Sequence, residues 1–178
     1  MRKIKFINSV LLLALSYTAT SAEQNPNRDN RFDTKFVYES RVTIDMDRVT
    51  VGQSKYGDRG IIWITGGNVV GPNIKADVIQ GGGDWQLGRP DGSQELQARY
   101  AIKTTDGFTI LVHNKAMVSP RPTPDNPHNN YTRSVISFEA PTPSPYEWMN
   151  KSLFLGTVEP AANFDKDPAV IIRVWELL

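Results

Sequence analysis

The sequence predicts an all-β fold, a sandwich or a barrel, with one short helical turn. Short segments of alternating apolar and polar residues recur along the chain, and Gly, Pro and Asp-Gly pairs separate them. Short strands at such regular spacing are typical of sandwiches and barrels. No stretch of useful length shows the periodicity of an amphipathic helix.

The composition bounds the function before any motif is considered. Hydrophobic residues make up 39% and charged residues 22% of the 178 positions, which is typical of one folded domain. A mean hydropathy of −0.38 argues against a polytopic membrane protein, and a formal net charge of +1 argues against a strongly basic nucleic-acid binder. The absence of cysteine excludes disulfides and cysteine-based metal sites. We therefore expect no metal and no nucleic-acid partner.

The first 22 residues are expected to be a secretory signal peptide. Basic residues precede the short apolar run Val10–Leu15, and Thr20–Ala22 forms a small-residue cleavage site. The apolar run is too short to span a bilayer, although a retained anchor is the alternative. Export without disulfides predicts a secreted, periplasmic protein with no stable membrane insertion after cleavage. The chain then divides into a signal peptide (1–22), a flexible leader (23–34) and one β-domain (35–178).

Alternation and turn residues predict the elements in order. The expected strands are Lys35–Ile44, Ile61–Ile64, Ile74–Gln80, Trp85–Leu87, Glu95–Thr105, Phe108–Lys115, Tyr131–Glu139, Leu153–Glu159 and Val170–Leu177. The Gly81–Gly83 run is not a phosphate loop, because neither a Lys-Ser/Thr pair nor a helix follows it. Glycines in a closed β-structure serve bulges and tight turns instead. Ser144–Glu147 is a capping box with Pro145 at the first helical position, which predicts the single helical turn.

Asp106-Gly107 is the strongest local signal and predicts a two-residue type I′ hairpin. Such a turn places Tyr100 opposite His113 and Arg99 opposite Asn114. Because directly opposed residues share a sheet face, Arg99 and Asn114 would lie on one face, and Tyr100 and His113 on the other. The pattern does not say which face is inside.

Several motifs together resemble the DUF3237 family, whose members are also described as UPF0311. They occur in family order between about Lys35 and the C-terminus, at Gly82–Gln86, Arg89–Gly92, Arg99-Tyr100, Thr105–Gly107, Asn114, Phe138-Glu139 and Tyr146–Asn150. The resemblance implies a single antiparallel β-barrel, lipocalin-like in architecture, with a pocket. For activity it implies cofactor-free acid–base chemistry on small organic molecules, such as cyclisation or isomerisation. The long proline-rich loop Ser119–Asn130 departs from the family pattern.

Four residues are candidate catalytic groups: Asp84, Arg99, Tyr100 and Glu139. Asp84 beside the aromatic Trp85 suits a general base, or else is a turn carboxylate. Arg99 suits a clamp on a substrate carboxylate or enolate, or else forms a salt bridge. Tyr100 is expected to exchange a proton with the histidine opposite it or to pack against it, and Glu139 is a second acid or an exposed strand end.

The remaining candidates are ligand-binding side chains: Trp85, His113, Asn114, Tyr146, Trp148 and Asn150. Tyr146 and Trp148 would either wall the pocket or close the bottom of the barrel. We expect Asp84, Arg99, Tyr100 and Asn114 to converge at one end of the barrel, at a rim or subunit interface that both sheet faces reach.

Two functions fit these residues. The first is a cofactor-free isomerase, lyase or cyclase that acts on a small organic compound. The alternative is a non-catalytic periplasmic binding module for a small hydrophobic ligand. The barrel also allows a homo-oligomer, in which one sheet face packs on a partner subunit.

Overall fold

A computed structural model describes residues 32–178 of the chain. The predicted signal peptide lies outside the described residues, as does the predicted leader up to residue 31. The strands are β1 (Thr34–Ile44), β2 (Val49–Ser54), β3 (Gly57–Gly71), β4 (Ile74–Gly88), β5 (Gln94–Thr104), β6 (Thr109–Pro120), β7 (Asn130–Glu139), β8 (Leu153–Pro160) and β9 (Ala169–Leu177), and the 3₁₀ helix η2 spans Glu147–Lys151.

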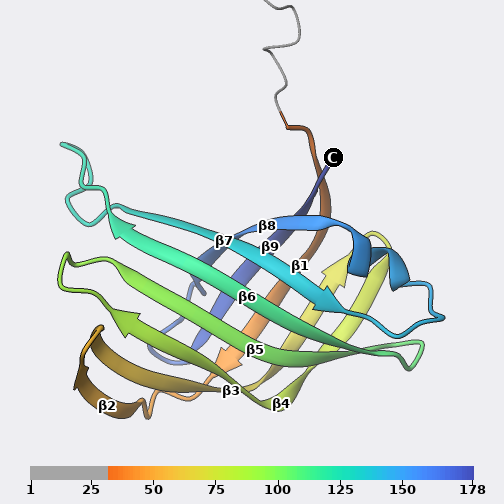
Figure 1. Cartoon of the computed structure of the whole chain (residues 1–178), viewed down its shortest axis with the longest axis horizontal. Helices are drawn as coiled ribbons and strands as arrows, with labels where there is room; N and C mark the ends of the chain where they lie inside the picture. Colours follow the sequence, from red (N-terminus) through yellow and green to blue (C-terminus); the bar gives the residue numbers. More distant parts are fainter. Residues whose placement is uncertain (1–31) are drawn as a thin grey trace, which may run out of the picture. The chain divides into compact units, whose positions relative to one another are not determined.

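The strands form one antiparallel sheet that closes into a barrel (Figure 1). Its order is β1-β9-β8-β7-β6-β5-β4-β3-β2, and an additional pairing of β1 with β3 closes the ring. The long strand β3 makes this possible, because its first part pairs with β2 and its second part with β1. The predicted β-barrel is confirmed. The sequence pattern missed β2, whose residues are almost all exposed.

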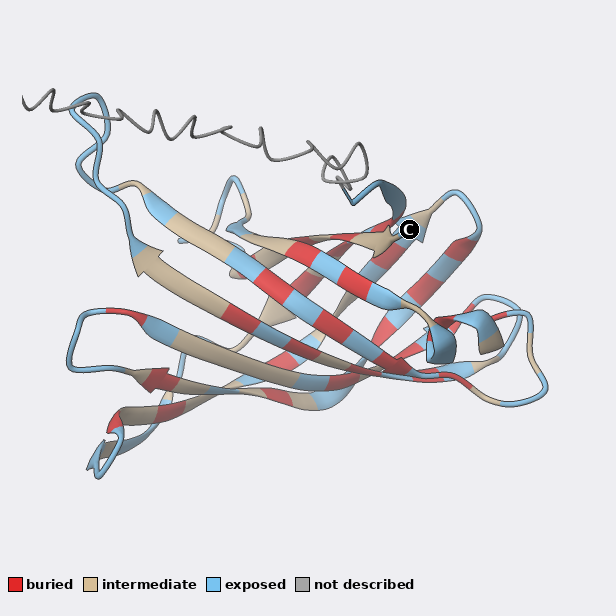
Figure 2. Cartoon of the chain, turned by 45° about the horizontal axis from the view of Figure 1, so that its top comes forward, coloured by how far each residue is buried: buried red, intermediate tan, exposed pale blue. Residues whose placement is uncertain are grey.

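Buried and exposed residues alternate along the strands, so that each strand directs one set of side chains into the barrel (Figure 2). One end of the interior is filled by large side chains, and we call it the closed end. There Phe138 and Phe154 meet edge to face with ring centroids 4.8 Å apart, and Met149 of η2 is 2% exposed. The opposite end, where β5 and β7 begin, contains a cavity that is described below.

The glycine runs form bulges, as the sequence predicted. Strand β4 is continuous where two strands were expected, and its register shifts between Ile79 and Gly83. Gly81 adopts a φ of +108°. A Cβ on Gly82 would lie 2.5 Å from Cβ of Tyr100, so only glycine lets the bulge approach β5 so closely.

The predicted helical turn is present as η2, but its capping differs from the prediction. The hydroxyl of Ser144 accepts a hydrogen bond from the backbone N–H of Tyr146 at 3.1 Å. The carboxylate of Glu147 pairs with the Lys151 ammonium at 2.7 Å instead of closing a capping box. In the described part of the chain, no helix has the length and hydrophobicity needed to cross a membrane.

The β5–β6 hairpin forms, but its turn is longer than predicted. The N–H of Thr104 donates to the carbonyl of Phe108 at 2.8 Å, and the N–H of Gly107 donates to the carbonyl of Thr104 at 2.9 Å. Thr105, Asp106 and Gly107 therefore form a three-residue loop, in which Gly107 has a φ of +96°. A type I turn followed by a glycine of positive φ produces such a loop. The type I′ prediction was wrong.

The extra loop residue shifts the hairpin register by one position. Tyr100 pairs with Val112, Arg99 with His113, and Ala98 with Asn114. A shift of one residue moves a side chain to the other sheet face. Tyr100 and Asn114 consequently point into the barrel, where they are 6% and 3% exposed, whereas Arg99 and His113 lie on the outer surface.

Candidate functional site

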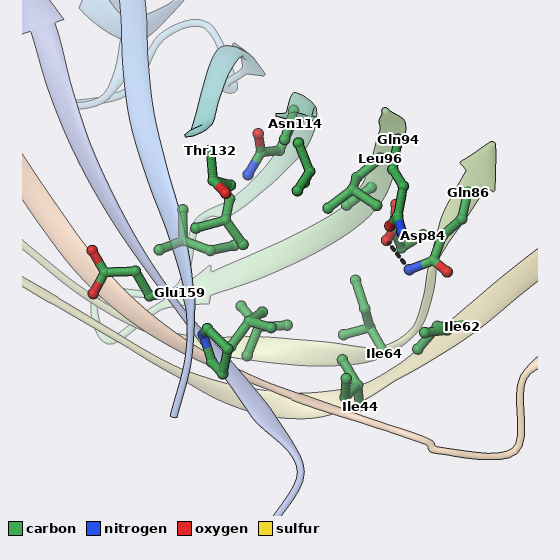
Figure 3. Close-up of a pocket in the computed structure, with 18 of the residues that line it drawn as sticks. Ile44, Ile62, Ile64, Asp84, Gln86, Gln94, Leu96, Asn114, Thr132 and Glu159 are labelled. Atoms are coloured by element: carbon green, nitrogen blue, oxygen red, sulfur yellow. Dashed lines mark hydrogen bonds between the residues drawn. The ribbon is translucent and has the colours of Figure 1, made fainter. Parts of the chain in front are cut away.

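The open end of the barrel holds a cavity of about 370 Å³, within the range typical of small-molecule sites. Its walls are formed by β1 and by strands β3 to β9 (Figure 3). Most lining side chains are aliphatic, and these include Val42, Ile44, Ile62, Ile64, Leu96, Ala98, Val118, Val158 and Ile172. The polar side chains that line it are Asp84, Gln86, Gln94, Tyr100, Asn114, Asn130, Thr132 and Glu159.

Asp84 is the carboxylate that this apolar cavity surrounds. Its Oδ2 accepts a hydrogen bond from Nε2 of Gln86 at 2.9 Å, the contact drawn in Figure 3. Its Oδ1 is buried and has no hydrogen-bond partner among the described residues. Burial raises the pKa of the Asp84 carboxyl above its usual value, and hydrogen bonding from the Gln86 side chain and the Gln97 backbone opposes this only in part. The residue therefore has the environment predicted for a general base.

The predicted cause of that environment was wrong. We expected Trp85 to form an aromatic wall beside the carboxylate. Adjacent residues of a strand point to opposite faces, and Trp85 lies outside the barrel, where it meets Trp63 at 6.4 Å between ring centroids. The aliphatic lining of the cavity, and not an indole ring, desolvates Asp84.

Asn114 lies on the same row of the inner sheet face as Asp84. Asp84 pairs with Ala98 of β5, and Ala98 pairs with Asn114 of β6. Oδ1 of Asn114 is buried without a hydrogen-bond partner among the described residues. Because alanine is short, the space above Ala98 is open between the carboxylate and the amide. Two polar side chains therefore flank an apolar gap.

Tyr100 forms part of the cavity floor. Burial raises the pKa of its hydroxyl far above the usual value. The neighbouring hydroxyls belong to Tyr38 and Ser40 of β1, both of which are fully buried. Burial, followed by the proximity of Tyr100, likewise raises the pKa of Tyr38. Tyr100 is thus a neutral hydroxyl at ordinary pH and suits a hydrogen-bond donor better than a base.

The structure does not bring Arg99, His113 and Glu139 to the cavity. They line a groove on the outer surface, together with Leu111 and Ser137. The predicted Tyr100–His113 pair does not exist, since the two side chains lie on opposite faces of the sheet. Of the four residues predicted to converge, three line the cavity: Asp84, Tyr100 and Asn114.

The last three candidates lie at the closed end. The hydroxyl of Tyr146 donates to Oδ1 of Asp106 at 3.1 Å. Asn150 accepts from the N–H of Ala140 at 2.7 Å and donates to its carbonyl at 2.9 Å. Trp148 packs beside Phe154, with ring centroids 5.7 Å apart. These contacts lie at the barrel bottom, which was the structural alternative for Tyr146 and Trp148. None of the three residues lines the cavity at the open end, although Tyr146 and Trp148 line a separate pocket beside Phe36 and Asp106.

Sequence reasoning missed the polar residues that accompany Asp84. Gln86 follows it by two positions, so strand alternation places both side chains on one face and was sufficient to find it. Gln94 and Thr132 lie at strand starts next to loops, where alternation gives little guidance. Only the closed barrel shows that they face the same space.

The chain resembles proteins of known sequence and structure over most of its length. The model of the family described as "Protein of unknown function (DUF3237)" matches residues 32–177. A UPF0311 protein of Rhodopseudomonas palustris is 34% identical over 155 residues, which cover 82% of this chain and 97% of the relative. The crystal structure of a conserved R. palustris protein of unknown function superposes with a TM-score of 0.71 at 32% identity, covering 83% of this chain and 99% of that one.

One further relative is described by its fold and another by its activity. A β-barrel-like protein of Acinetobacter baumannii has a TM-score of 0.73 at 25% identity, with 88% of this chain and 100% of that chain covered. A protein of Penicillium herquei named hydroalkoxylation enzyme phnH is 30% identical over 115 residues, which cover 65% of this chain and 72% of the relative.

Proposed function

The chain belongs to the DUF3237 family, and from this premise we propose that its cavity is a cofactor-free acid–base site in which Asp84 moves a proton on a small, uncharged organic molecule. One observation carries the proposal: the Asp84 carboxylate lines a mostly aliphatic cavity and has a buried oxygen without a hydrogen-bond partner among the described residues. Such groups are costly to keep in a folded protein, and they concentrate at functional sites.

The charge of the cavity supports an uncharged substrate. Apart from Asp84, the only carboxylate among the lining residues is Glu159, and its Oε2 accepts a hydrogen bond from Nη1 of Arg173 at 2.9 Å. No lysine, arginine or histidine of the described chain lines the cavity. An anionic ligand would meet Asp84 without a compensating cation. Because Arg99 lies outside the cavity, it does not serve as the expected carboxylate clamp.

The raised pKa gives Asp84 the strength that the reaction needs. A carboxylate is an ordinary base of low pKa in water, and it becomes a stronger base as its pKa rises towards the working pH. We propose that Asp84 accepts a proton from a hydroxyl or an activated carbon and returns it to another carbon. The neutral hydroxyl of Tyr100 suits a donor to a substrate oxygen.

The Penicillium relative supports a reaction of this class. Hydroalkoxylation adds the O–H of an alcohol across a carbon–carbon double bond. A C–O bond forms, the π bond breaks, and the hydroxyl proton ends on carbon. The atoms and electrons balance with no oxidant or reductant, so that the reaction needs only proton transfer. We propose a cyclisation or isomerisation with the same balance for this chain.

The test uses uncharged hydroxyenones in D₂O, with deuterium incorporation and ring closure followed by mass spectrometry. The wild-type protein should accelerate one or both processes. Asp84→Asn should lower that rate by about 10²-fold or more, while Arg99→Ala, a variant on the outer surface, should keep it. An Asp84→Asn protein that works at the wild-type rate would exclude this role for Asp84.

One observation favours the non-catalytic alternative. Asp84 is the only carboxylate or imidazole that the described cavity offers for proton transfer, once Glu159 is assigned to Arg173. A binding module for a small hydrophobic ligand requires only the aliphatic walls and a polar anchor. It would bind hydroxyenones without converting them, and Asp84→Asn would alter the affinity alone.

We also propose that the chain is exported to the periplasm. Residues 1–22 have the basic, apolar and small-residue regions of a signal peptide. The family match begins only at residue 32, so this segment precedes the family domain. N-terminal sequencing of protein from the periplasmic fraction should give a chain that begins at Glu23. A chain that still carries Met1 there would contradict the proposal.

A further inference from the structure

We propose that the cavity is two-sided and selects an uncharged molecule that carries hydroxyl groups along one edge and hydrocarbon along the opposite edge. This selection rests on the proposed function only in taking the cavity as the ligand site, and it does not depend on proton transfer by Asp84. It would therefore hold for an enzyme and for a binding module alike. The polar and the apolar side chains of the lining lie on different parts of the ring of strands.

Four neighbouring strands carry the polar groups of the lining. β4, β5, β6 and β7 are consecutive in the sheet, and we call their inner faces the polar half. Aliphatic residues such as Leu96 and Val118 lie between the polar groups, so that each group is a single point in an otherwise apolar wall. The polar residues that line this half are Asp84, Gln86, Gln94, Tyr100, Asn114, Asn130 and Thr132.

The other four strands that close the ring, β8, β9, β1 and β3, form what we call the apolar half. Figure 3 shows three isoleucines of this half, Ile44, Ile62 and Ile64, across the cavity from Asn114 and Thr132. With the loop between β8 and β9, the apolar half lines the cavity with Val42, Ile44, Ile62, Ile64, Val158, Pro160, Phe164, Val170 and Ile172.

Glu159 of β8 is the polar residue that lines the cavity on the apolar half. Its carboxylate is engaged elsewhere, because Oε2 accepts a hydrogen bond from Nη1 of Arg173 at 2.9 Å. In Figure 3 the carboxylate points away from the other labelled side chains. Glu159 therefore does not offer a ligand the hydrogen bonds that the polar half offers.

The buried hydroxyls of Tyr38 and Ser40 on β1 leave this division unchanged. They neighbour Tyr100, and neither residue lines the described cavity. A ligand hydroxyl that lies against the apolar half therefore loses its hydrogen bonds to water and gains none, which weakens binding. A hydroxyl that lies against the polar half exchanges those bonds for bonds to protein groups.

Two buried oxygens of the polar half indicate which groups the ligand carries on its polar edge. Oδ1 of Asp84 and Oδ1 of Asn114 have no hydrogen-bond partner among the described residues, and both residues line the cavity. An ionised carboxylate and an amide oxygen accept hydrogen bonds and do not donate them. Hydroxyl groups, which donate, are therefore the complement of this wall. The cavity volume of about 370 Å³ accommodates a small ring system.

Two isomeric diols test the selection. 2,7-Dihydroxynaphthalene carries both hydroxyls on one long edge of its ring system, whereas 2,6-dihydroxynaphthalene carries them on opposite edges. Both are uncharged near pH 6, because a phenolic hydroxyl has a pKa of about 10. Isothermal titration calorimetry of the wild-type protein should give the 2,7 isomer a Kd that is lower by tenfold or more, because the 2,6 isomer must place a hydroxyl against the apolar half.

Two valine variants form a matched pair. Val170→Thr exchanges a methyl group for a hydroxyl on the apolar half, and Val118→Thr makes the same exchange on the polar half. Both valines are partly exposed. Val170→Thr gives the 2,6 isomer a hydrogen-bond partner and should reduce the ratio of the two Kd values by threefold or more. Val118→Thr should leave that ratio unchanged or raise it.

Equal affinities of the wild-type protein for the two isomers would overturn the two-sided selection, and so would the absence of binding tighter than about 1 mM for either. Equal effects of the two threonine variants would overturn it as well, since the halves would then not differ. Identical far-ultraviolet circular dichroism spectra establish that the compared chains are folded, and the comparison of isomers on the wild type needs no variant.

The outcome is distinguishable from that of the proposed reaction. Asp84→Asn keeps a polar side chain on the polar half, so its preference for the 2,7 isomer should persist although proton transfer is lost. A protein that prefers the 2,7 isomer but does not convert hydroxyenones would contradict the acid–base reaction alone. A protein that converts hydroxyenones but binds both diols equally would contradict the two-sided selection alone.

Discussion

Asp84 and Asn114 lie on one row of the inner sheet face with only Ala98 between them. Each has an oxygen that is buried without a hydrogen-bond partner among the described residues. Buried polar groups are nearly always satisfied in folded proteins, so two neighbouring exceptions call for an explanation. We propose that a ligand that lies over Ala98 and carries hydroxyl groups satisfies both oxygens.

The first prediction concerns the space above Ala98. Ala98→Leu should fill the gap between the carboxylate and the amide, and binding of the uncharged dye N-phenyl-1-naphthylamine should fall by tenfold or more. The larger side chain extends into a cavity and not into packed core, so the free energy of unfolding should change by less than about 1.5 kcal/mol. Fluorescence titration and urea unfolding measure the two quantities. Full dye affinity in the Leu variant would place the binding site elsewhere.

The second prediction is the pH dependence that Asp84 imposes. Its carboxyl has a pKa that is raised in the folded state, so the folded protein binds the proton more tightly than the unfolded chain. The free energy of unfolding therefore falls as pH rises through the region between the unfolded and the folded pKa. Asp84→Asn removes this loss and should stabilise the protein at pH 7 by about 1 kcal/mol or more. The advantage should vanish at pH values below the unfolded pKa, as urea unfolding at several pH values will show.

The third prediction separates Asn150 from the cavity. Asn150→Ala loses both hydrogen bonds to the backbone of Ala140 and should lower the free energy of unfolding by about 1–3 kcal/mol. Asn150→Asp keeps the acceptor and should lose less. Both variants should bind N-phenyl-1-naphthylamine as the wild type does, because the residue lies at the closed end. If dye affinity fell while the free energy of unfolding stayed unchanged, Asn150 would be a ligand-binding residue.

The fourth prediction compares two glycines. A Cβ on Gly107 meets open space, so Gly107→Ala should cost only the backbone strain of a positive φ, about 1–2 kcal/mol. Gly82→Ala would press on Cβ of Tyr100 at 2.5 Å and on the carbonyl of Arg99 at 2.7 Å. Since both contacts involve β5, this variant should lose more stability and should also weaken dye binding. Equal effects in thermal unfolding would contradict the close approach of the bulge to β5.

The strands were largely predictable because alternation has a direct cause. Each strand buries one face in the barrel, so its apolar residues recur at every second position, as in β7. Strand β2 was not predicted because almost all of its residues are exposed, so that it has no alternation of apolar and polar residues to detect. The break predicted at Gly81–Gly83 is a bulge within one strand, and local sequence does not distinguish an interruption from an insertion.

The site was less predictable because one loop residue decides it. Asp-Gly occurs both in two-residue turns and as the end of three-residue loops, and the two differ by one position in register. The predicted register put Asn114 on the same sheet face as Arg99. In the structure, Asn114 shares the inner face with Tyr100. Asp84 faces the cavity whatever the length of that turn, although the Trp85 wall from which it was predicted is absent. Tyr146 bonds Asp106, which is distant in sequence. Trp148 and Asn150 contact Phe154 and Ala140, which flank η2 in sequence, and the contacts depend on how that turn packs.

The packing of the closed end has a consequence for turnover. If its bulky side chains seal that side, whatever enters the cavity of the described barrel leaves through the mouth by which it came. Product and substrate then use the same opening, so the product must dissociate before the next substrate molecule binds. An enzyme of this design should show competitive inhibition by its own product, and its loops at the mouth would set the pace of exchange while the bottom stays fixed.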